Sequence, residues 1–308
     1  MDYLAVSDEV RSALAERRAV VALESTLVAH GMPWPENFEV GRALEDEVRR
    51  HGAVPATVAV VRGKVTVGID GETLERMARA SGGDKWRKAG LADLGPLCAR
   101  GADGATTVSA TTFAAARAGV RLFATGGIGG VHRGDEWDVS SDLGTIAREP
   151  VAVVSAGAKA ILDLPRTLEV LETLGVLVVG VRTDEMPAFY TRASGLALEH
   201  RVETPAEAAR LLHAHWSLHG ARGVVLANPI PKPHELDRAT IDRAIDAALK
   251  DAQHANVRGK ALTPHLLAFV ARATLKRSLA ANRALALANA ELAAQVAMAL
   301  QTLPPLAA

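Results

Sequence analysis

The sequence is short of cysteine and has no excess of charge of either sign. Cys98 is its single cysteine, so no disulfide can form within the chain, and this usage favours a reducing compartment. The 35 Lys and Arg residues balance 35 Asp and Glu residues. Without a net positive field, nothing draws the chain to a nucleic-acid polymer or an anionic membrane, and we expect neither partner.

A signal peptide, a membrane span and a linker are also missing from the pattern. Residues 1–20 are amphipathic and lack the basic start, apolar run and cleavage site of a secretory signal. No uninterrupted apolar run reaches the length of about 20 residues that crosses a bilayer. Because no low-complexity or Ser/Pro-rich stretch divides the chain, we expect one domain over residues 1–308, located in the cytoplasm.

The sequence does contain short, nearly continuous apolar runs with helical patterns between them. Such runs are typical of strands covered on both faces, and the intervening helices suit right-handed crossovers. They predict an α/β protein with three α/β/α layers around a mostly parallel, mixed sheet. A tight turn at Arg62-Gly63-Lys64 predicts one hairpin within it. The clearest runs cover residues 18–26, 56–61, 120–127, 150–157, 175–183 and 222–229.

After residue 231 the pattern becomes helical. Helices are predicted at about residues 235–255, 263–276 and 278–302. The last of them is rich in Ala and Leu and has few charges. This composition favours packing against the body of the protein or against a neighbouring subunit.

Several predicted strands end in polar residues or glycine. In an open parallel sheet the carboxyl ends of the strands form the ligand crevice, so we expect these ends to converge at one edge. Glu24, at one such end, is a candidate general acid, although a charge-paired or helix-capping carboxylate fits equally well. The ends are Glu24-Ser25-Thr26, Thr125-Gly126-Gly127, Ser155-Ala156-Gly157, Thr183-Asp184-Glu185 and Asn228-Pro229.

Lys159 stands among small and aliphatic residues in VAVVSAGAKAILDL, residues 151–164, where a predicted strand passes into a helix. Lysine attacks carbon only as a neutral amine, and burial near another cation favours that form. The small neighbours leave room for a substrate. The residues alone leave two interpretations open, a nucleophile or an ammonium that reaches solvent from the first turn of the helix.

The segment HRGDEWDVSSDL, residues 132–143, gathers Asp135, Glu136, Asp138 and Asp142. Carboxylates and water are the ligands that Mg²⁺ and Mn²⁺ prefer at sites with few protein ligands. Solvated acidic loops and helix caps have the same composition. The segment is therefore a candidate cation site, although its residues alone favour a solvated loop or a helix cap.

Two stretches rich in small residues, 101–112 and 124–134, suit an anion-binding nest of backbone N–H groups. The second stretch nearly matches the dinucleotide pattern G-x-G-x-x-G. His132 stands where the third glycine belongs, and no clear ribose-binding acid follows. We therefore do not expect a nicotinamide cofactor.

Nine segments occur in the order VALESTLVAHGMPWPEN, GAVPATVAVVRGK, GATTVSATT, FATGGIGGVHRG, DVSSDL, SAGAKAILDLPRTLEVLETLGV, MPAFY, ANPIP and SLAANRALALANA. Together they resemble the pseudouridine-5′-phosphate glycosidase family, which includes the indigoidine synthase A-like proteins. The resemblance runs from about residue 5 to residue 300. It is far more specific than any single motif.

The resemblance implies an indigoidine synthase A-like fold with a helical C-terminal part. It also implies reversible cleavage of the C–C glycosidic bond of pseudouridine 5′-phosphate, giving uracil and ribose 5-phosphate through a covalent lysine–sugar intermediate. A divalent cation, Mn²⁺ or another such as Mg²⁺, and a homotrimer are implied as well. The roles that carry over are Glu24 as proton donor, Lys159 as nucleophile, Asp138 as metal ligand, and Lys88, Val108, Ser140, Ser141, Asp142 and Asn282 as substrate-binding residues, with Asn282 at the uracil edge.

The phosphate side departs from the family. KAGLADL, residues 88–94, stands where Ser-Arg-Arg-Asp commonly follows the lysine, so a hydroxyl and two guanidiniums suited to phosphate are missing. A non-phosphorylated or differently substituted C-nucleoside therefore stays open as the substrate. The sequence is also compatible with a Schiff-base lyase acting on a sugar phosphate and with a metabolite-binding relative without turnover.

Overall fold

A mixed sheet runs through the protein. The computed structural model describes residues 3–81, 83, 85–134, 137–220, 222–257 and 259–305. In these residues eleven strands form one sheet in the order β1-β4-β3-β2-β7-β9-β13-β11-β12, with β6 paired to β3 and β5 to β6. The strands are β1 (Leu4–Val6), β2 (Val20–Leu23), β3 (Val54–Val61), β4 (Lys64–Val67), β5 (Arg87–Ala89), β6 (Gly104–Thr106), β7 (Leu122–Ala124), β9 (Ala152–Ser155), β11 (Leu177–Val181), β12 (His200–Val202) and β13 (Val224–Ala227). β8 (Val131–His132) and β10 (Leu162–Asp163) form a separate antiparallel pair.

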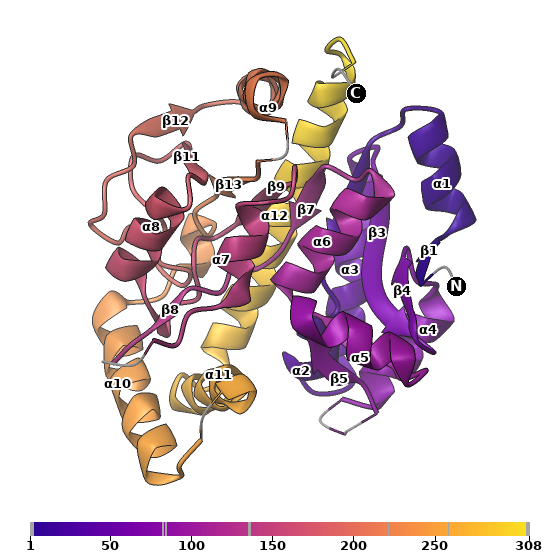
Figure 1. The fold of residues 1–308 in the computed structure, drawn as a ribbon. Helices are drawn as coiled ribbons and strands as arrows, with labels where there is room; N and C mark the ends of the chain where they lie inside the picture. The colour runs from indigo at the N-terminus through magenta and orange to yellow at the C-terminus, as the bar shows by residue number, and fades with distance from the viewer. Residues whose placement is uncertain are drawn as a thin grey trace.

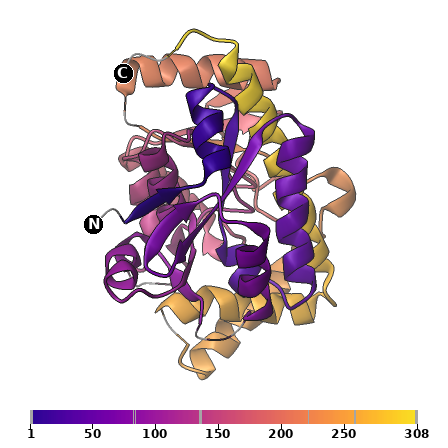
Figure 2. The same cartoon turned by 90° about the vertical axis from the view of Figure 1, so that its right-hand side faces the viewer.

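Helices cover both faces of the sheet. α3, α9 and α12 pack together on one face, and α6, α7 and α8 lie on the other (Figure 1, Figure 2). The three layers confirm the predicted α/β/α fold. The helices are α1 (Asp8–Ala15), α2 (Thr26–His30), α3 (Glu36–Arg50), α4 (Gly71–Arg79), α5 (Leu94–Ala99), α6 (Val108–Ala118), α7 (Ser141–Ile146), α8 (Leu164–Thr173), α9 (Pro205–His219), α10 (Arg238–His254), α11 (Leu262–Ala273) and α12 (Arg277–Gln301), with 3-10 turns at Leu91–Asp93, Lys232–His234 and Gly259–Ala261.

The apolar runs of the sequence form the central strands. β2, β9 and β13 are buried at every residue, as expected of strands covered on both faces. From β3 through β2, β7, β9 and β13 to β11 all neighbours are parallel. β3 and β4 form the predicted hairpin. Its two turn residues, Arg62 and Gly63, have φ values of 49° and 73°, as the twist of a tight hairpin requires.

α12 packs along the sheet against β2, β7 and β9 and also contacts α3 and α9 (Figure 1). By length and composition alone this helix of 25 residues could cross a bilayer, because an 18-residue stretch of it has a mean hydropathy of 1.2. Arg283 and Glu291 interrupt its apolar residues, so it is not an uninterrupted apolar run. Of the residues in its most apolar 18-residue stretch, 50% are buried inside the protein. A core helix has the same length and composition, and the contacts show the predicted packing against the body.

The carboxyl ends of the central parallel strands lie at one edge of the sheet, as predicted. Beyond this edge lie α10 and α11, in the lower part of Figure 1. Residues of α11 and of the strand ends line the same cavity. The fold therefore brings residues from distant parts of the chain to one place.

Candidate active site

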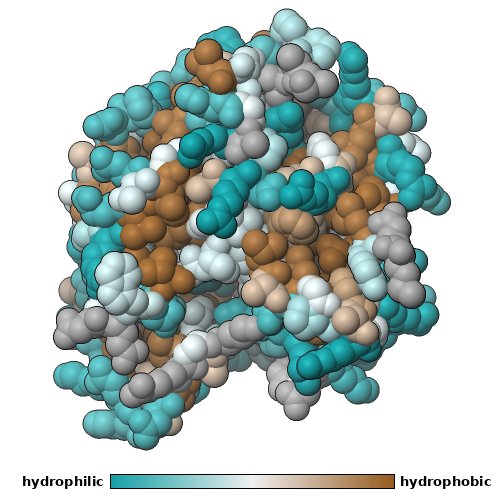
Figure 3. Space-filling view, in the orientation of Figure 1, coloured by the Kyte–Doolittle hydropathy of each residue, from teal (hydrophilic) through white to brown (hydrophobic). Residues whose placement is uncertain are grey.

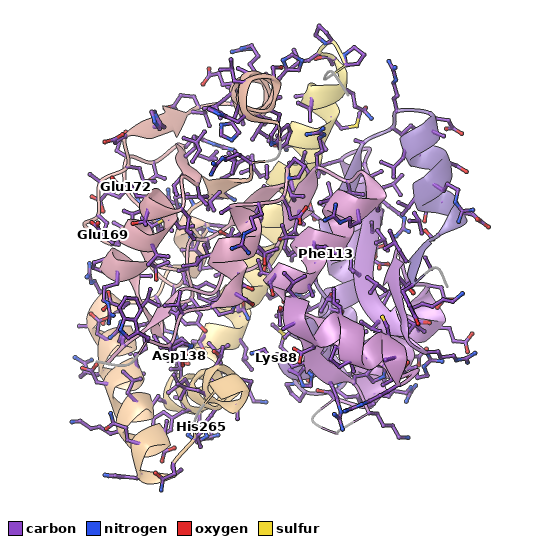
Figure 4. The ribbon with its side chains drawn as sticks, viewed as in Figure 1. Lys88, Phe113, Asp138, Glu169, Glu172 and His265 are labelled. Atoms are coloured by element: carbon purple, nitrogen blue, oxygen red, sulfur yellow. The ribbon has the colours of Figure 1, made fainter. Side chains whose placement is uncertain are left out.

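A cavity of about 420 Å³ lies at the carboxyl edge of the sheet. Figure 3 shows that this face of the molecule is hollowed in its lower middle, and Figure 4 shows Lys88 and Asp138 on the two sides of that region, above α11. Thr263 and Leu267 of α11 line one side. All the residues predicted for the site line the cavity: Glu24, Lys88, Val108, Asp138, Ser140, Ser141, Asp142, Lys159 and Asn282.

Glu24 is the first residue beyond β2, beside the end of β7. The two strands are paired to their last residues, so Glu24 and Thr125 follow next to each other, and Thr125 Oγ1 donates a hydrogen bond to Glu24 Oε1. Burial raises the pKa of the Glu24 carboxyl, while the Lys159 ammonium and the Thr125 hydrogen bond oppose this rise. A carboxyl that retains its proton is suited to act as a general acid.

Lys159 lies on a loop, and the predicted strand-to-helix junction is wrong. β9 ends at Ser155, and β10 pairs with β8 before α8 begins at Leu164. Lys159 N donates to Ile128 O at 3.1 Å, and Lys159 Nζ donates to Gly127 O at 2.6 Å. A strand pair of two residues leaves no periodicity in a sequence, so the pattern could not indicate it. The loop places the amine beside the end of β7.

Asp142 joins two walls of the cavity. Its Oδ1 accepts a hydrogen bond from Ser109 N and its Oδ2 accepts one from Gly129 N, both at 2.8 Å. Ser140 caps α7 by accepting a hydrogen bond from Asp142 N at 3.2 Å, and Ser141 Oγ donates to Ser109 Oγ at 3.1 Å. The side chain of Asp142 therefore fixes the glycine segment after β7 relative to the start of α6.

We expect Gly129→Ala to damage the cavity and the fold together. A Cβ at Gly129 would lie 2.6 Å from Asp142 Oδ2 and would also overlap Ser140 Oγ, which breaks the Gly129 to Asp142 hydrogen bond. Overpacking of this kind costs about 1–3 kcal/mol, which a urea midpoint detects. The matched control is Gly144→Ala in α7, whose Cβ would meet only Arg148 Nη1, at 3.9 Å, and whose stability should not fall. Equal midpoints for both variants would contradict this view of Gly129.

Lys88, Val108 and Asn282 come from three other elements: β5, the start of α6 and α12. Asn282 is buried, and its Oδ1 lies 3.0 Å from the position that a Cβ of Gly126 would occupy. A side chain at residue 126 would therefore push against Asn282. The glycine brings α12 close to the end of β7.

Basic side chains flank the altered stretch 88–94. A second cavity, of about 570 Å³, shares His30 and Lys88 with the first and carries Arg87 and Arg100 on its wall. Burial lowers the pKa of His30, and Lys88 lowers it further. Cationic groups are thus present on this side, although the stretch itself lacks guanidiniums.

Of the two acids that the structure describes in the segment 132–143, Asp138 is the one that stays open to a ligand. Asp135 and Glu136 lie outside the described residues, and both oxygens of Asp142 accept backbone hydrogen bonds. The side chain of Asp138 is 43% exposed, and its Oδ2 lies 4.0 Å from His132 Nε2. A carboxylate and an imidazole on one wall are groups that could hold a divalent cation together with water.

His132 lines the cavity although the sequence patterns did not indicate it. Burial lowers the pKa of the imidazole, Asp138 opposes this shift, and Lys88 and Lys159 add to it. The ring is therefore favoured in its neutral form near pH 7, in which it can donate and accept hydrogen bonds or bind a metal. The available signal was its place in the glycine segment, at the position where the dinucleotide pattern fails.

Another carboxylate and histidine cluster lies outside the cavity. Glu47 of α3, His51 directly after α3 and Glu291 of α12 offer ligand atoms within 4.8 Å of one another. His51 Nε2 lies 3.1 Å from Glu47 Oε1 and 3.9 Å from Glu291 Oε1, and Arg50 also pairs with Glu47. The described residues therefore include a possible cation site that is separate from Asp138.

Comparison with known proteins gives close matches over almost the whole chain. The family described as indigoidine synthase A like protein matches residues 9–299. The pseudouridine-5′-phosphate glycosidase of Caldanaerobacter subterraneus subsp. tengcongensis is 52% identical over 303 residues, which cover 98% of each chain. The protein of the same name from Sorangium cellulosum is 50% identical over 304 residues, which cover 98% of this chain and 95% of the relative.

Two solved structures share the fold. The prealnumycin C-glycosynthase AlnA in complex with ribulose 5-phosphate has a TM-score of 0.89 and 40% identity, with 98% of each chain covered. An indigoidine synthase A-like protein from Thermotoga maritima has a TM-score of 0.88 and 33% identity, with 97% of each chain covered. Because the family match and these identities extend over nearly its full length, the chain belongs to the indigoidine synthase A like protein family.

Proposed function

We propose that the protein is a pseudouridine-5′-phosphate glycosidase, which reversibly cleaves the C–C glycosidic bond to give uracil and ribose 5-phosphate. The observation that carries this proposal is the pair of Glu24 and Lys159 in one cavity, both bonded to residues 125–127. The names of relatives at half identity support the substrate. A neighbour described as a C-glycosynthase in complex with ribulose 5-phosphate supports a sugar phosphate.

The chemistry needs both side chains. The leaving atom is carbon C5 of uracil, so protonating a leaving oxygen, as ordinary glycosidases do, does not release the base. Glu24 protonates the ring oxygen as the sugar opens, and the neutral Lys159 amine bonds to C1′. Protonation of C5 then lets uracil depart and leaves an imine, which water hydrolyses to ribose 5-phosphate and the free lysine. The raised pKa of Glu24 supports its role as the acid.

We propose that Asp138 holds a divalent cation, Mn²⁺ or another such as Mg²⁺, with His132 beside it. The donor set fits, because these ions accept a single carboxylate and fill the remaining positions with water and substrate oxygens. When bound, the cation would neutralise negative charge on the substrate. Lys88 supplies positive charge to the same cavity.

Asp138→Asn is expected to lower the rate of uracil release, and excess Mn²⁺ should restore it only partly, because an amide oxygen carries no charge to hold the ion. The measurement is the rate as a function of Mn²⁺ concentration. Glu291→Gln, in the separate cluster, is the control and should leave the Mn²⁺ dependence unchanged. The reverse outcome, with only Glu291→Gln affected, would move the catalytic cation away from Asp138.

A substrate panel tests the proposed function. Pseudouridine 5′-phosphate should release uracil, and pseudouridine should react more slowly because it lacks the phosphate that the basic side chains favour. Equal rates would support the second candidate, a glycosidase for a non-phosphorylated C-nucleoside, which the uncharged Gly90, Leu91 and Ala92 favour. Aldol-type products without uracil would point to a Schiff-base lyase, and ligand binding without turnover to a binding protein.

We also propose that residues 1–308 act as one domain, that the protein works in the cytoplasm and that it assembles as a homotrimer. The resemblance to the family supports the trimer, and light scattering of the purified protein tests it. A monomer in solution would remove that part of the proposal.

A further inference from the structure

A pair of asparagine side chains lies behind the cavity. Asn289 of α12 is 0% exposed. Its Nδ2 donates to Thr125 O at 2.8 Å and approaches Gly126 O at 3.5 Å. Asn228, just beyond β13, donates from Nδ2 to Asn289 Oδ1 at 2.9 Å, which orients the amide of Asn289 with its nitrogen toward β7.

The segment that Asn289 contacts is the one that holds the proposed acid and nucleophile. Thr125 Oγ1 donates to Glu24 Oε1, and Gly127 O accepts from Lys159 Nζ at 2.6 Å. A continuous path of hydrogen bonds and three residues of backbone therefore links α12 to both reacting groups.

The segment 125–127 needs support from outside. Two of its three residues are glycines, which restrict the backbone least. Gly126 O accepts a hydrogen bond from Ala156 N at 3.0 Å, but Thr125 O is held by the Asn289 side chain. Without the amide, the Thr125 carbonyl just beyond β7 would lose a buried partner and the segment could shift.

We propose that Asn289 is a positioning residue for the reaction: its amide fixes residues 125–127 so that Thr125 holds the carboxyl of Glu24 and Gly127 O holds the amine of Lys159. The proposal rests on the proposed function for its kinetic test. Asn289 does not line the cavity, so it acts through Thr125 and Gly127 and not by touching substrate.

A purely structural role is the competing explanation, and Asn37 provides the matched control. Asn37 is 1% exposed, and its Nδ2 donates to Val28 O at 2.8 Å and to Ala78 O at 2.9 Å. It is thus a buried asparagine that bonds two backbone carbonyls, away from residues 125–127. If Asn289 only satisfies carbonyls, Asn289→Leu and Asn37→Leu should behave alike.

The first experiment compares Asn289→Leu, Asn228→Leu and Asn37→Leu by kcat and KM for pseudouridine 5′-phosphate over a range of pH. We expect kcat of Asn289→Leu to fall about ten- to a hundredfold with a smaller change in KM, the size expected for misplaced reacting groups. Asn228→Leu should lower kcat less, because the amide nitrogen of Asn289 can still donate to Thr125 O. Asn37→Leu should lose stability without this split between kcat and KM.

The pH profile supplies the second readout. The Thr125 hydroxyl lowers the pKa of Glu24, so releasing Thr125 should raise that pKa and move the alkaline limb of kcat to higher pH. Thr125→Val should cause the same shift directly. If Asn289 acts through Thr125, the alkaline limb of the double variant Asn289→Leu/Thr125→Val should move no further than that of Thr125→Val alone.

Three outcomes would overturn the proposal. The alkaline limb of kcat could stay in place in Asn289→Leu, or the shifts of Asn289→Leu and Thr125→Val could add up in the double variant. The kinetics of Asn289→Leu could also equal those of Asn37→Leu. Should Asn289→Leu not fold, Asn289→Ser, which keeps a small hydroxyl in place of the amide, carries the same expectations. A wild-type protein that releases no uracil would defeat the proposed function instead. In that case a carbon NMR titration still tests the positioning role of Asn289, with the Glu24 signal assigned by its loss in Glu24→Gln. A higher pKa of Glu24 in the Asn289 variant supports the proposal, and an unchanged pKa overturns it.

Discussion

Lys159→Ala is expected to abolish uracil release while leaving the fold intact. The neutral amine is the group that forms the covalent bond, and loss of a nucleophile lowers kcat by about 10⁴-fold or more. The side chain makes one hydrogen bond, from Nζ to Gly127 O, so its removal costs only about 1–3 kcal/mol of stability. The measurements are uracil release and borohydride trapping with ribose 5-phosphate, followed by mass spectrometry of the labelled residue.

Lys88→Ala is the control for this experiment, because Lys88 is the other lysine predicted for the same cavity. Its loss should weaken substrate binding, while ribose 5-phosphate at high concentration should still be trapped on Lys159. A Lys159→Ala protein that turns over at the wild-type rate, or an adduct found on Lys88, would refute the assignment of the nucleophile.

Glu24→Gln is expected to lower kcat by about 10²- to 10⁴-fold, the usual contribution of general acid catalysis. Glutamine keeps the shape, and its amide oxygen can still accept the hydrogen bond from Thr125. In the wild type the rate should fall as pH rises through the raised pKa of Glu24, because the acid is then ionised. The residual rate of Glu24→Gln should not fall over this pH range.

Stability provides an independent check on Glu24. Its pKa is raised in the folded protein, so the unfolded chain loses this proton at lower pH, and folding stability falls as pH rises from the unfolded toward the folded pKa. Glu24→Gln should therefore be more stable than the wild type at neutral pH, as measured by urea unfolding. A variant with less stability than the wild type would show that the charged carboxylate contributes to the fold.

Glu45 is the matched control for Glu24→Gln. It is 8% exposed and accepts a hydrogen bond from Thr57 Oγ1 at 2.6 Å, and burial raises the pKa of its carboxyl. It does not line the cavity. Glu45→Gln should leave kcat unchanged. If both variants lost activity equally, the effect of Glu24→Gln would have to be assigned to the fold and not to proton transfer.

The central strands could be predicted from the sequence because burial on both faces leaves continuous apolar runs, as in VVAL of β2. Short strands such as β5, β8 and β10 could not, because two or three residues form a strand only where tertiary pairing supplies the partner. The same limit explains the error at Lys159, whose loop depends on the pairing of β8 with β10.

The site residues follow a similar division. Glu24 could be chosen from its place at the end of an apolar strand, whereas Val108, Lys88 and Asn282 were expected only because the chain resembles a family. For His132 the sequence offered only its place in the glycine segment, and for Asn289 it offered no signal. Asn289 is one of several polar residues in an Ala/Leu-rich helix, and only the packing of α12 against β7 shows which of them meets the strand end.

Since α12 follows every strand in the chain, the order of synthesis matters. A nascent chain that has emerged only through β13 has its strands but not the helix that covers β2, β7 and β9. Until the ribosome has released α12, that apolar surface stays uncovered and attractive to chaperones, and neither Asn282 nor Asn289 has reached the end of β7. Catalytic competence should therefore arise only after α12 has been synthesised and has packed against β2, β7 and β9.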